Sequence, residues 1–242
     1  MRAFIIGDTH GFLELIQRAR KIALKQKCDC IIVCGDFGWW PKWINKDKSL
    51  HMFLSLVTEQ KKIPIYFVDG NHEELPDLFS YPIREDGLRE LGPALFHIPR
   101  GNIVDIFGAK IFGYGGGHSI DRAFRTEGVD WFPEEVPTYA ECDKAITNLE
   151  ETDELDLIIT HDIPTELKFR MFPKQYAYNT VPEQLSQFIE PCMKFPKDIN
   201  WFTGHYHMFH RQKVANCWIQ VLPNHPTDGM IFNTKINKIE EI

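Results

Sequence analysis

Short apolar stretches alternate with amphipathic ones along the first third of the chain. Residues 2–6, 29–34 and 63–68 are mainly β-branched or aromatic apolar residues, which predicts three buried strands. Apolar residues recur at helical spacing over 12–26, and a second helix is predicted over 45–60. Short apolar strands separated by helices are typical of an α/β protein in which helices cover the sheet.

The middle and the end of the chain lose this regular alternation. Glycine and proline break residues 94–120 into strand-like pieces, and residues 121–137 show little periodicity. The remaining predicted elements are a helix over 138–150, a buried strand over 155–160, a short helix near 182–190 within an otherwise irregular stretch, and short strands joined by turns over 199–240. We therefore expect an α/β fold with two layered sheets flanked by helices, formed by one domain over residues 1–242.

Composition limits the class of protein without identifying a ligand. Of the 242 residues, 43% are apolar and 25% are charged, the balance of a globular domain with a sizeable core. The net charge of −7 and the lack of a long Lys or Arg run give no bulk attraction to nucleic acid, although a local basic groove would escape this test. The first residues, MRAFIIGDTHG, predict a strand rather than a signal peptide or a membrane span.

Cysteine usage favours a reducing compartment. The six cysteines lie at positions 28, 30, 34, 142, 192 and 217, and none forms a CxxC pair. We expect reduced thiols in a cytoplasmic protein, and no structural zinc site built on cysteine.

Polar side chains with metal-binding or acid–base chemistry follow five of the predicted strands. The motifs are GDTHG after the first strand, GDFG after the second, GNHE after the third, His161 after LDLIIT and GHYH after INWFTG. Ligands of α/β proteins gather at the carboxyl ends of strands. The side chains delivered there are Asp8, His10, Asp36, Asn71, His72, His161, His205 and His207.

These side chains have the composition of a metal site. In an extended segment residues i and i+2 point the same way, so the pairs in GDTHG and GHYH are each expected to act as a two-armed clamp. Imidazole nitrogens together with carboxylate oxygens suit Mn, Fe, Zn or Ni. The donors outnumber the needs of one ion, which indicates two ions sharing a carboxylate, an arrangement suited to displacement at phosphorus. Taken alone, each motif is more often part of a turn, a loop or a surface pair. The metal site is favoured because all five motifs occur in order, each after a predicted strand.

The series Asp-x-His, Gly-Asp, Gly-Asn-His-Glu, His and Gly-His-x-His resembles the motifs of the calcineurin-like metallophosphoesterase superfamily. The resemblance implies a two-sheet α/β sandwich flanked by helices, with a dinuclear metal site at the strand ends. The ligands that it implies are Asp8, His10, Asp36 and His207 for one ion, and Asp36, Asn71, His161 and His205 for the other. It also implies that a hydroxide between the ions attacks phosphorus, and that His72 stabilises the transition state or protonates the leaving oxygen.

Two positions depart from the branch that these motifs most resemble, the protein Ser/Thr phosphatases and diadenosine tetraphosphatases. That branch has an Asp and an Arg after its second motif, where this chain has Trp39 and Trp40. It also has an Arg before Gly-Asn-His, where this chain has Asp69. Two phosphate-gripping arginines are therefore missing at their expected places. The usual carboxylate partner of His72 is missing too, and Asp69 or Asp162 is its candidate replacement.

The segment around 80–137 is the expected source of substrate specificity. It contains GYGGGHSIDRAFR, in which His118, Arg122 and Arg125 are candidate substrate-binding residues; the alternative is a glycine turn followed by a solvated helix start. Trp39 and its neighbouring tryptophans either cap the sheet or wall the pocket and stack on a flat group of the substrate.

The sequence thus predicts a dinuclear metal-dependent phosphoesterase that acts on a nucleotide or another small phosphoester, with His72 and Asp36 as catalytic residues. Manganese is the favoured metal, with Fe, Zn or Ni as alternatives. The competing hypotheses are a phosphomonoesterase of the protein Ser/Thr phosphatase type, a nuclease, and a metal-binding module without catalysis. The two missing arginines favour diesters, because a monoester carries two negative charges. The oligomeric state is left open.

Overall fold

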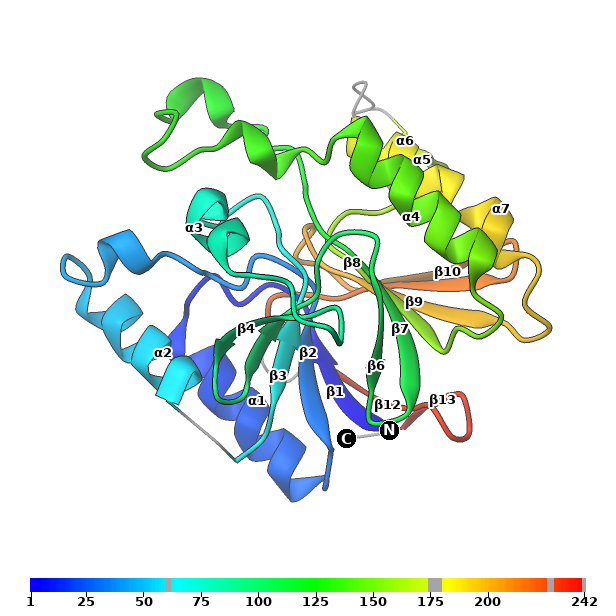
Figure 1. The fold of residues 1–242 in the computed structure, drawn as a ribbon, viewed down its shortest axis with the longest axis horizontal. Helices are drawn as coiled ribbons and strands as arrows, with labels where there is room; N and C mark the ends of the chain where they lie inside the picture. Colours follow the sequence, from blue (N-terminus) through cyan, green and yellow to red (C-terminus); the bar gives the residue numbers. More distant parts are fainter. Residues whose placement is uncertain (60–61, 174–179, 226–228, 241–242) are drawn as a thin grey trace.

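The computed structural model describes residues 1–59, 62–173, 180–225 and 229–240, which form two stacked β-sheets between two layers of helices (Figure 1). The strands of the first sheet are β1 (Arg2–Ile6), β2 (Cys30–Val33), β3 (Ile65–Phe67), β4 (Arg89–Gly92), β5 (Leu95–His97), β12 (Met230–Asn233) and β13 (Lys238–Glu240). Those of the second are β6 (Ile103–Ile106), β7 (Ala109–Tyr114), β8 (Leu157–Thr160), β9 (Ile199–Thr203), β10 (His210–Val214) and β11 (Cys217–Val221).

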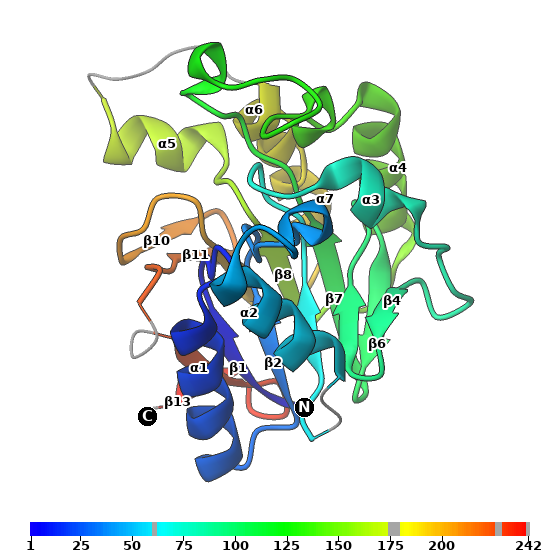
Figure 2. The ribbon, with the colours of Figure 1, turned by 90° about the vertical axis from the view of Figure 1, so that its left-hand side faces the viewer.

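Helices flank both sheets, and Figure 2 shows α1 and α2 in front of the strands of the first. The α-helices are α1 (Leu13–Lys25), α2 (Lys48–Glu59), α3 (Leu75–Ser80), α4 (Tyr139–Glu151), α5 (Thr165–Met171), α6 (Thr180–Gln187) and α7 (Ile189–Cys192). Three short 3-10 turns complete the described elements: η1 (Pro41–Trp43), η2 (Arg122–Phe124) and η3 (Pro133–Glu135).

Strand order explains why the motifs converge. The first sheet has the order β13-β12-β1-β2-β3-β5-β4 and the second β10-β11-β9-β8-β7-β6. β1, β2, β3 and β5 are parallel to one another, and so are β7, β8, β9 and β11. Because parallel strands share their carboxyl end, each sheet brings the segments that follow its parallel strands to a single edge.

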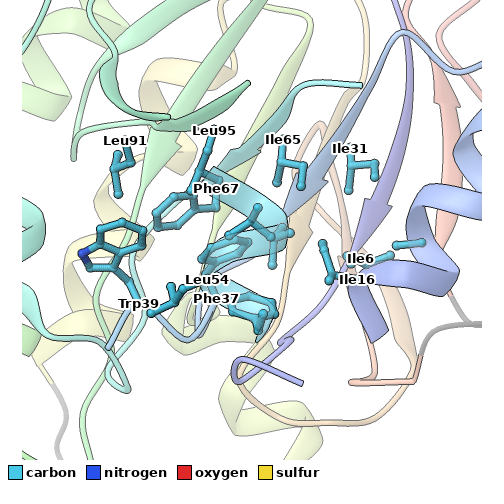
Figure 3. Close-up of a cluster of buried hydrophobic side chains, with 14 of the residues drawn as sticks. Ile6, Ile16, Ile31, Phe37, Trp39, Leu54, Ile65, Phe67, Leu91 and Leu95 are labelled. Carbon is cyan, nitrogen blue, oxygen red and sulfur yellow. The ribbon is translucent and has the colours of Figure 1, made fainter. Parts of the chain in front are cut away.

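Alternation along the strands separates the core into layers. In β1, Phe4 and Ile6 join a cluster with buried residues of α1, α2 and α3, some of which Figure 3 shows. Ala3 and Ile5 point the other way and pack in a cluster between the two sheets. Successive side chains of a strand point to opposite faces, so one apolar strand serves both layers.

The second sheet is covered in the same way by α4 to α7. Thr138 and Glu141 form a capping box that starts α4. Three residues of this helix, Cys142, Ala145 and Leu149, are buried at helical spacing against the sheet.

The expected fold class and the main strands and helices are confirmed. The sequence prediction missed β4, α3 and α5. β4 is a short antiparallel strand at the edge of its sheet with charged Arg89 and Glu90, and α3 has only six residues. α5 buries a single residue, Leu167, so it leaves no periodic apolar pattern in a stretch that we expected to be irregular. None of the helices in the described ranges has the length and apolar character that crossing a membrane requires.

Candidate metal centre

Two clusters of metal-binding side chain types lie at the shared edge of the sheets. One contains Asp8, His10 and His207, and the other contains Asp36, His161 and His205. Within each cluster, one ligand atom of every residue lies within 4.8 Å of the others. The strands β1, β2, β8 and β9 therefore bring together six side chains that are far apart in sequence.

The first cluster is built around one oxygen of Asp8. Its Oδ2 lies 2.8 Å from Nε2 of His207 and 3.6 Å from Nε2 of His10. The two imidazole nitrogens are themselves 3.0 Å apart. The other oxygen, Oδ1, accepts the backbone N–H of His205, so the carboxylate is held while its Oδ2 faces the histidines.

The second cluster is built around Nε2 of His161. Oδ1 of Asn71 and Nδ1 of His205 each lie 3.1 Å from this nitrogen, and Oδ1 of Asp36 lies 3.5 Å from it. Nδ1 of His161 is 2.9 Å from the carbonyl oxygen of Cys34, to which it donates. In the neutral ring, Nε2 then carries a lone pair that points toward the lone pairs of the neighbouring oxygen and nitrogen atoms. A metal cation placed among these atoms would bind all of their lone pairs.

The electrostatics of the second cluster favour a positive charge. Burial opposes a charge on His161, but the carboxylates of Asp36 and Asp8 outweigh it and raise the pKa of His161 to about 10. Burial would raise the pKa of Asp36, but the neighbouring imidazoles of His161, His72 and His10 hold it well below its usual range. The carboxylates and imidazoles of both clusters thus fit divalent metal ions of the kind that accept mixed nitrogen and oxygen ligands.

The backbone at the histidines of GDTHG and GHYH bends, whereas we expected these two motifs to be extended. His10, Asp36, His205 and His207 all have positive φ angles, from 45° to 68°. They are four of the eight non-glycine residues with positive φ in the described ranges. Such angles are uncommon for non-glycine residues, although Asp and His adopt them more readily than most, and they gather at functional sites. The bend also separates the two histidines of GHYH, which join different clusters.

Two glycines in the motifs are required by close approach. A Cβ atom on Gly70 would collide with Oδ1 of Asp36, and one on Gly204 would collide with Oδ1 of Asp8. Each glycine therefore lets a neighbouring loop pass directly over a carboxylate of the centre.

Glu73 holds the loop that carries Asp36, a role that we did not assign from the GNHE motif. Its buried carboxylate accepts the backbone N–H groups of Phe37 (2.6 Å), Gly38 (3.2 Å) and Trp39 (2.6 Å). Burial, with the nearby charge of Asp36, raises the pKa of Glu73. Glu73, the last residue of GNHE, thereby fixes the backbone that follows Asp36 in GDFG.

The partner of His72 is Arg125 and neither of the carboxylates that we proposed. Nη1 of Arg125 lies 2.8 Å from Nδ1 of His72, and Nη2 lies 3.3 Å from Nε2. Arg125 is held in turn by an ion pair with Asp121 at 2.8 Å. Asp162 instead accepts a hydrogen bond from the hydroxyl of Tyr206 at 2.6 Å.

Asp69 belongs to a separate buried ion pair. Its Oδ2 accepts two hydrogen bonds from Arg100, at 2.9 and 2.6 Å, and its Oδ1 lies 3.0 Å from Nε2 of His97. Arg100 and His97 together hold the pKa of Asp69 well below its usual range although burial opposes this. Asp69, which stands where the phosphatase branch has an arginine, is thus buried in an ion pair with Arg100.

A second network behind the centre also escaped sequence analysis. Ser119, which follows β7, accepts a hydrogen bond from Nδ2 of Asn71 at 3.0 Å. It donates from Oγ and from its backbone N–H to the carboxylate of Glu135, at 2.6 and 2.9 Å. Glu135 is fully buried. The two residues lie in a segment without periodicity, so no local pattern signals their contact.

The candidate substrate-binding residues separate into three environments. A cavity of about 820 Å³, here named the metal cavity, is lined by His118 and Arg122 together with residues of both clusters and His72. Arg125 lines a neighbouring cavity of about 410 Å³. Trp39 lines neither: it is 3% exposed, donates from Nε1 to Asp77 and packs in the apolar cluster of Figure 3. Trp39 is therefore a core residue, and its assignment to substrate binding was wrong.

An α/β sandwich that gathers two carboxylate–imidazole clusters at one edge of its sheets is the architecture of a metal-dependent phosphoesterase. The chain belongs to the calcineurin-like phosphoesterase family, whose sequence model matches residues 1–209, a range that contains both clusters. The protein is therefore a hydrolase of phosphoric esters.

The fold is shared with proteins of very different sequence. TT1561 of Thermus thermophilus is 13% identical, with a TM-score of 0.54 over 99% of this chain and 96% of that one. A putative 5′-nucleotidase of Staphylococcus aureus is 13% identical, with a TM-score of 0.55 over 99% of this chain and 52% of that one. GAP50 of Plasmodium is 10% identical, with a TM-score of 0.51 over 100% and 87%. At these identities the likeness shows the fold alone. No curated protein matches the chain.

Proposed function

We propose that this protein is a dinuclear metal-dependent phosphoesterase that hydrolyses a small phosphodiester or nucleotide. The observation that carries the proposal is the position of Asp36 between the two clusters. Its Oδ2 lies 3.8 Å from Nε2 of His10, and its Oδ1 lies 3.5 Å from Nε2 of His161. A carboxylate whose two oxygens face two donor clusters is suited to bridge two ions.

These distances, the two clusters and the motifs of the family support one ligand set for each ion. The first ion would take Asp8, His10, Asp36 and His207, and the second Asp36, Asn71, His161 and His205. Mixed nitrogen and oxygen donors favour Mn, with Fe, Zn or Ni as alternatives. When bound, such ions supply an activated water near neutral pH and neutralise charge on the phosphoryl oxygens.

His72 is the proposed catalytic side chain for the leaving oxygen. Its backbone N–H donates to Oδ1 of Asp36 at 2.8 Å, and its carbonyl accepts from Nε1 of Trp40 at 2.9 Å. These two bonds hold the backbone of His72, and Arg125 holds the ring. The imidazole lines the metal cavity, where it can hydrogen-bond or protonate the oxygen that departs from phosphorus.

The charges around the metal cavity support a diester over a monoester. Arg122 lies 3.1 Å from Nε2 of His118, and Arg125 is engaged by His72 and by Asp121. Arg125 is therefore committed to protein partners, whereas Arg122 and Lys168 line the metal cavity. A dianionic monoester needs more positive charge than a monoanionic diester, so the absence of the two arginines of the phosphatase branch favours the diester.

The test compares an aryl phosphate monoester with an aryl phosphate diester, in the presence of Mn²⁺, Ni²⁺ or Fe²⁺. We expect faster hydrolysis of the diester and two bound ions per chain by elemental analysis. Asp36→Asn should lower the rate by at least about 10³-fold, because it weakens both ion sites at once. Asp153→Asn, at an exposed carboxylate that lines neither cavity, serves as the matched control.

Three results would contradict the proposal. Two bound ions without hydrolysis of either ester would indicate a metal-binding module. Cleavage of single-stranded or duplex nucleic acid, with the small esters untouched, would indicate a nuclease. Clearly faster hydrolysis of the monoester would indicate a phosphomonoesterase, one of the competing hypotheses.

A further inference from the structure

A second cavity opens beside the metal cavity, and the two share the ring of His10. We name it the side cavity; it has a volume of about 410 Å³ and is lined by His10, Phe12, Trp40, Trp43, Leu50 and Arg125 among others. Arg125 connects the two spaces, because its guanidinium contacts His72, which lines the metal cavity. A group that occupied the side cavity would therefore be next to the reacting phosphorus.

The walls of the side cavity are aromatic. Trp43 and Trp40 are half-buried, and Phe12 is 58% exposed although its ring is large and apolar. Phe12 lies just before α1 and makes an edge contact with His10, with ring centroids 6.5 Å apart. A single exposed phenylalanine is ordinary, but here it lines one cavity with two tryptophans and Leu50.

The charges of the side cavity cancel. Its lining includes two cations, Lys46 and Arg125, and two carboxylates, Asp47 and Asp130. Nζ of Lys46 lies 4.4 Å from the centre of the Trp43 ring, a cation–π contact at the rim. This space offers no excess positive charge for a second phosphate, and its aromatic walls suit a flat, uncharged group.

We propose that the side cavity binds a nucleobase, so that the natural substrate is a nucleoside phosphoester whose base lies between Phe12 and the tryptophans while its phosphorus lies at the metal centre. The inference rests on the proposed function and narrows its substrate class. Stacking on aromatic side chains accepts any base, because every base has a flat face. The side cavity therefore explains the aromatic residues beside Asp36 without assigning Trp39 to the ligand.

The test isolates the base by comparing two ligands that differ by it. Calorimetry with Mn²⁺-supplemented protein measures the Kd of adenosine 5′-monophosphate and of ribose 5-phosphate. We expect the nucleotide to bind about tenfold more tightly, as one stacked base would provide. In Phe12→Ala and in Trp43→Ala this advantage should fall below about threefold. Trp218→Ala is the matched control, since Trp218 is half-buried and lines neither cavity.

The outcomes separate this inference from the proposed function. Equal affinities in the wild type, or an advantage that persists in both Phe12→Ala and Trp43→Ala, would overturn the inference. If the advantage were lost in Phe172→Ala alone, the base would be assigned to the metal cavity, because Phe172 lines that cavity and not the side cavity. This result would also overturn the inference. Hydrolysis of aryl diesters reports the proposed function independently, so it can succeed while the base subsite fails.

Discussion

Asn71 donates from Nδ2 to the hydroxyl of Ser119 at 3.0 Å, and this bond turns its Oδ1 toward His161, 3.1 Å away. Ser119 donates in turn to buried Glu135 at 2.6 Å. An amide can present either its oxygen or its nitrogen to a neighbour. The carboxylate of Glu135 thus decides which atom of Asn71 faces the centre.

Replacing Ser119 should therefore weaken one ion site and spare the other. In Ser119→Ala the amide of Asn71 loses its acceptor and is free to rotate, and loss of such a supporting bond costs about 10- to 100-fold in metal affinity. Titration calorimetry with Mn²⁺ should show one weakened site and one unchanged site. Glu135→Gln should act in the same direction, and Glu134→Gln, at an exposed neighbour, is the control. Two sites of unaltered affinity in Ser119→Ala would refute this account.

Arg125 should matter for turnover more than for binding. Its contact with both ring nitrogens of His72 orients the imidazole, and a misplaced catalytic group costs up to about 10²-fold in rate. We expect Arg125→Ala to lower kcat for an aryl diester about 10- to 100-fold with a smaller change in KM. Arg18→Ala, at an exposed arginine of α1, should leave both constants unchanged. A rise in KM at constant kcat would instead make Arg125 a substrate-binding residue.

The ion pair between Arg100 and Asp69 should be important for stability. Both side chains are buried, and the removal of one partner leaves an uncompensated charge inside the protein. Arg100→Met is expected to lower the free energy of unfolding by about 3–5 kcal/mol, as measured by urea denaturation. The double variant with Asp69→Asn should recover part of this loss. A decrease below about 1 kcal/mol in the single variant would be inconsistent with the buried pair.

His97 should make stability depend on pH. Burial lowers the pKa of His97 from the ordinary value of 6.5, and the charge of Arg89 beside Nδ1 lowers it further, although Asp69 beside Nε2 opposes the shift. As the pH falls through 6.5, the unfolded chain binds a proton that the folded chain refuses, so the free energy of unfolding decreases. His97→Gln should therefore show a smaller decrease between about pH 7 and pH 5. An identical pH profile in wild type and variant would show that His97 does not contribute.

The amino-acid sequence by itself determined the fold class and the identity of the residues at the centre. Apolar runs ended by Asp, Asn or His are visible along the chain, because the alternation of strands and the chemistry of ligands are both local properties. Asp8, Asp36, Asn71 and His161 could be chosen in this way, and the structure brings all of them to one edge. Short or edge elements such as α3 and β4 were missed, since their stability comes from neighbours and not from their own pattern.

Only the tertiary structure decided how these side chains are held. The partner of His72 is Arg125, whereas we expected a carboxylate. Trp39 is buried in the core, and Glu73 holds the loop that carries Asp36. The tertiary structure also brought Glu135 close to Asn71, although the two residues are 64 positions apart in the sequence. No local pattern in either segment predicts this proximity. Hydrogen bonds and ion pairs of this kind depend on distance in space, and distance in space is set by the packing of both sheets together.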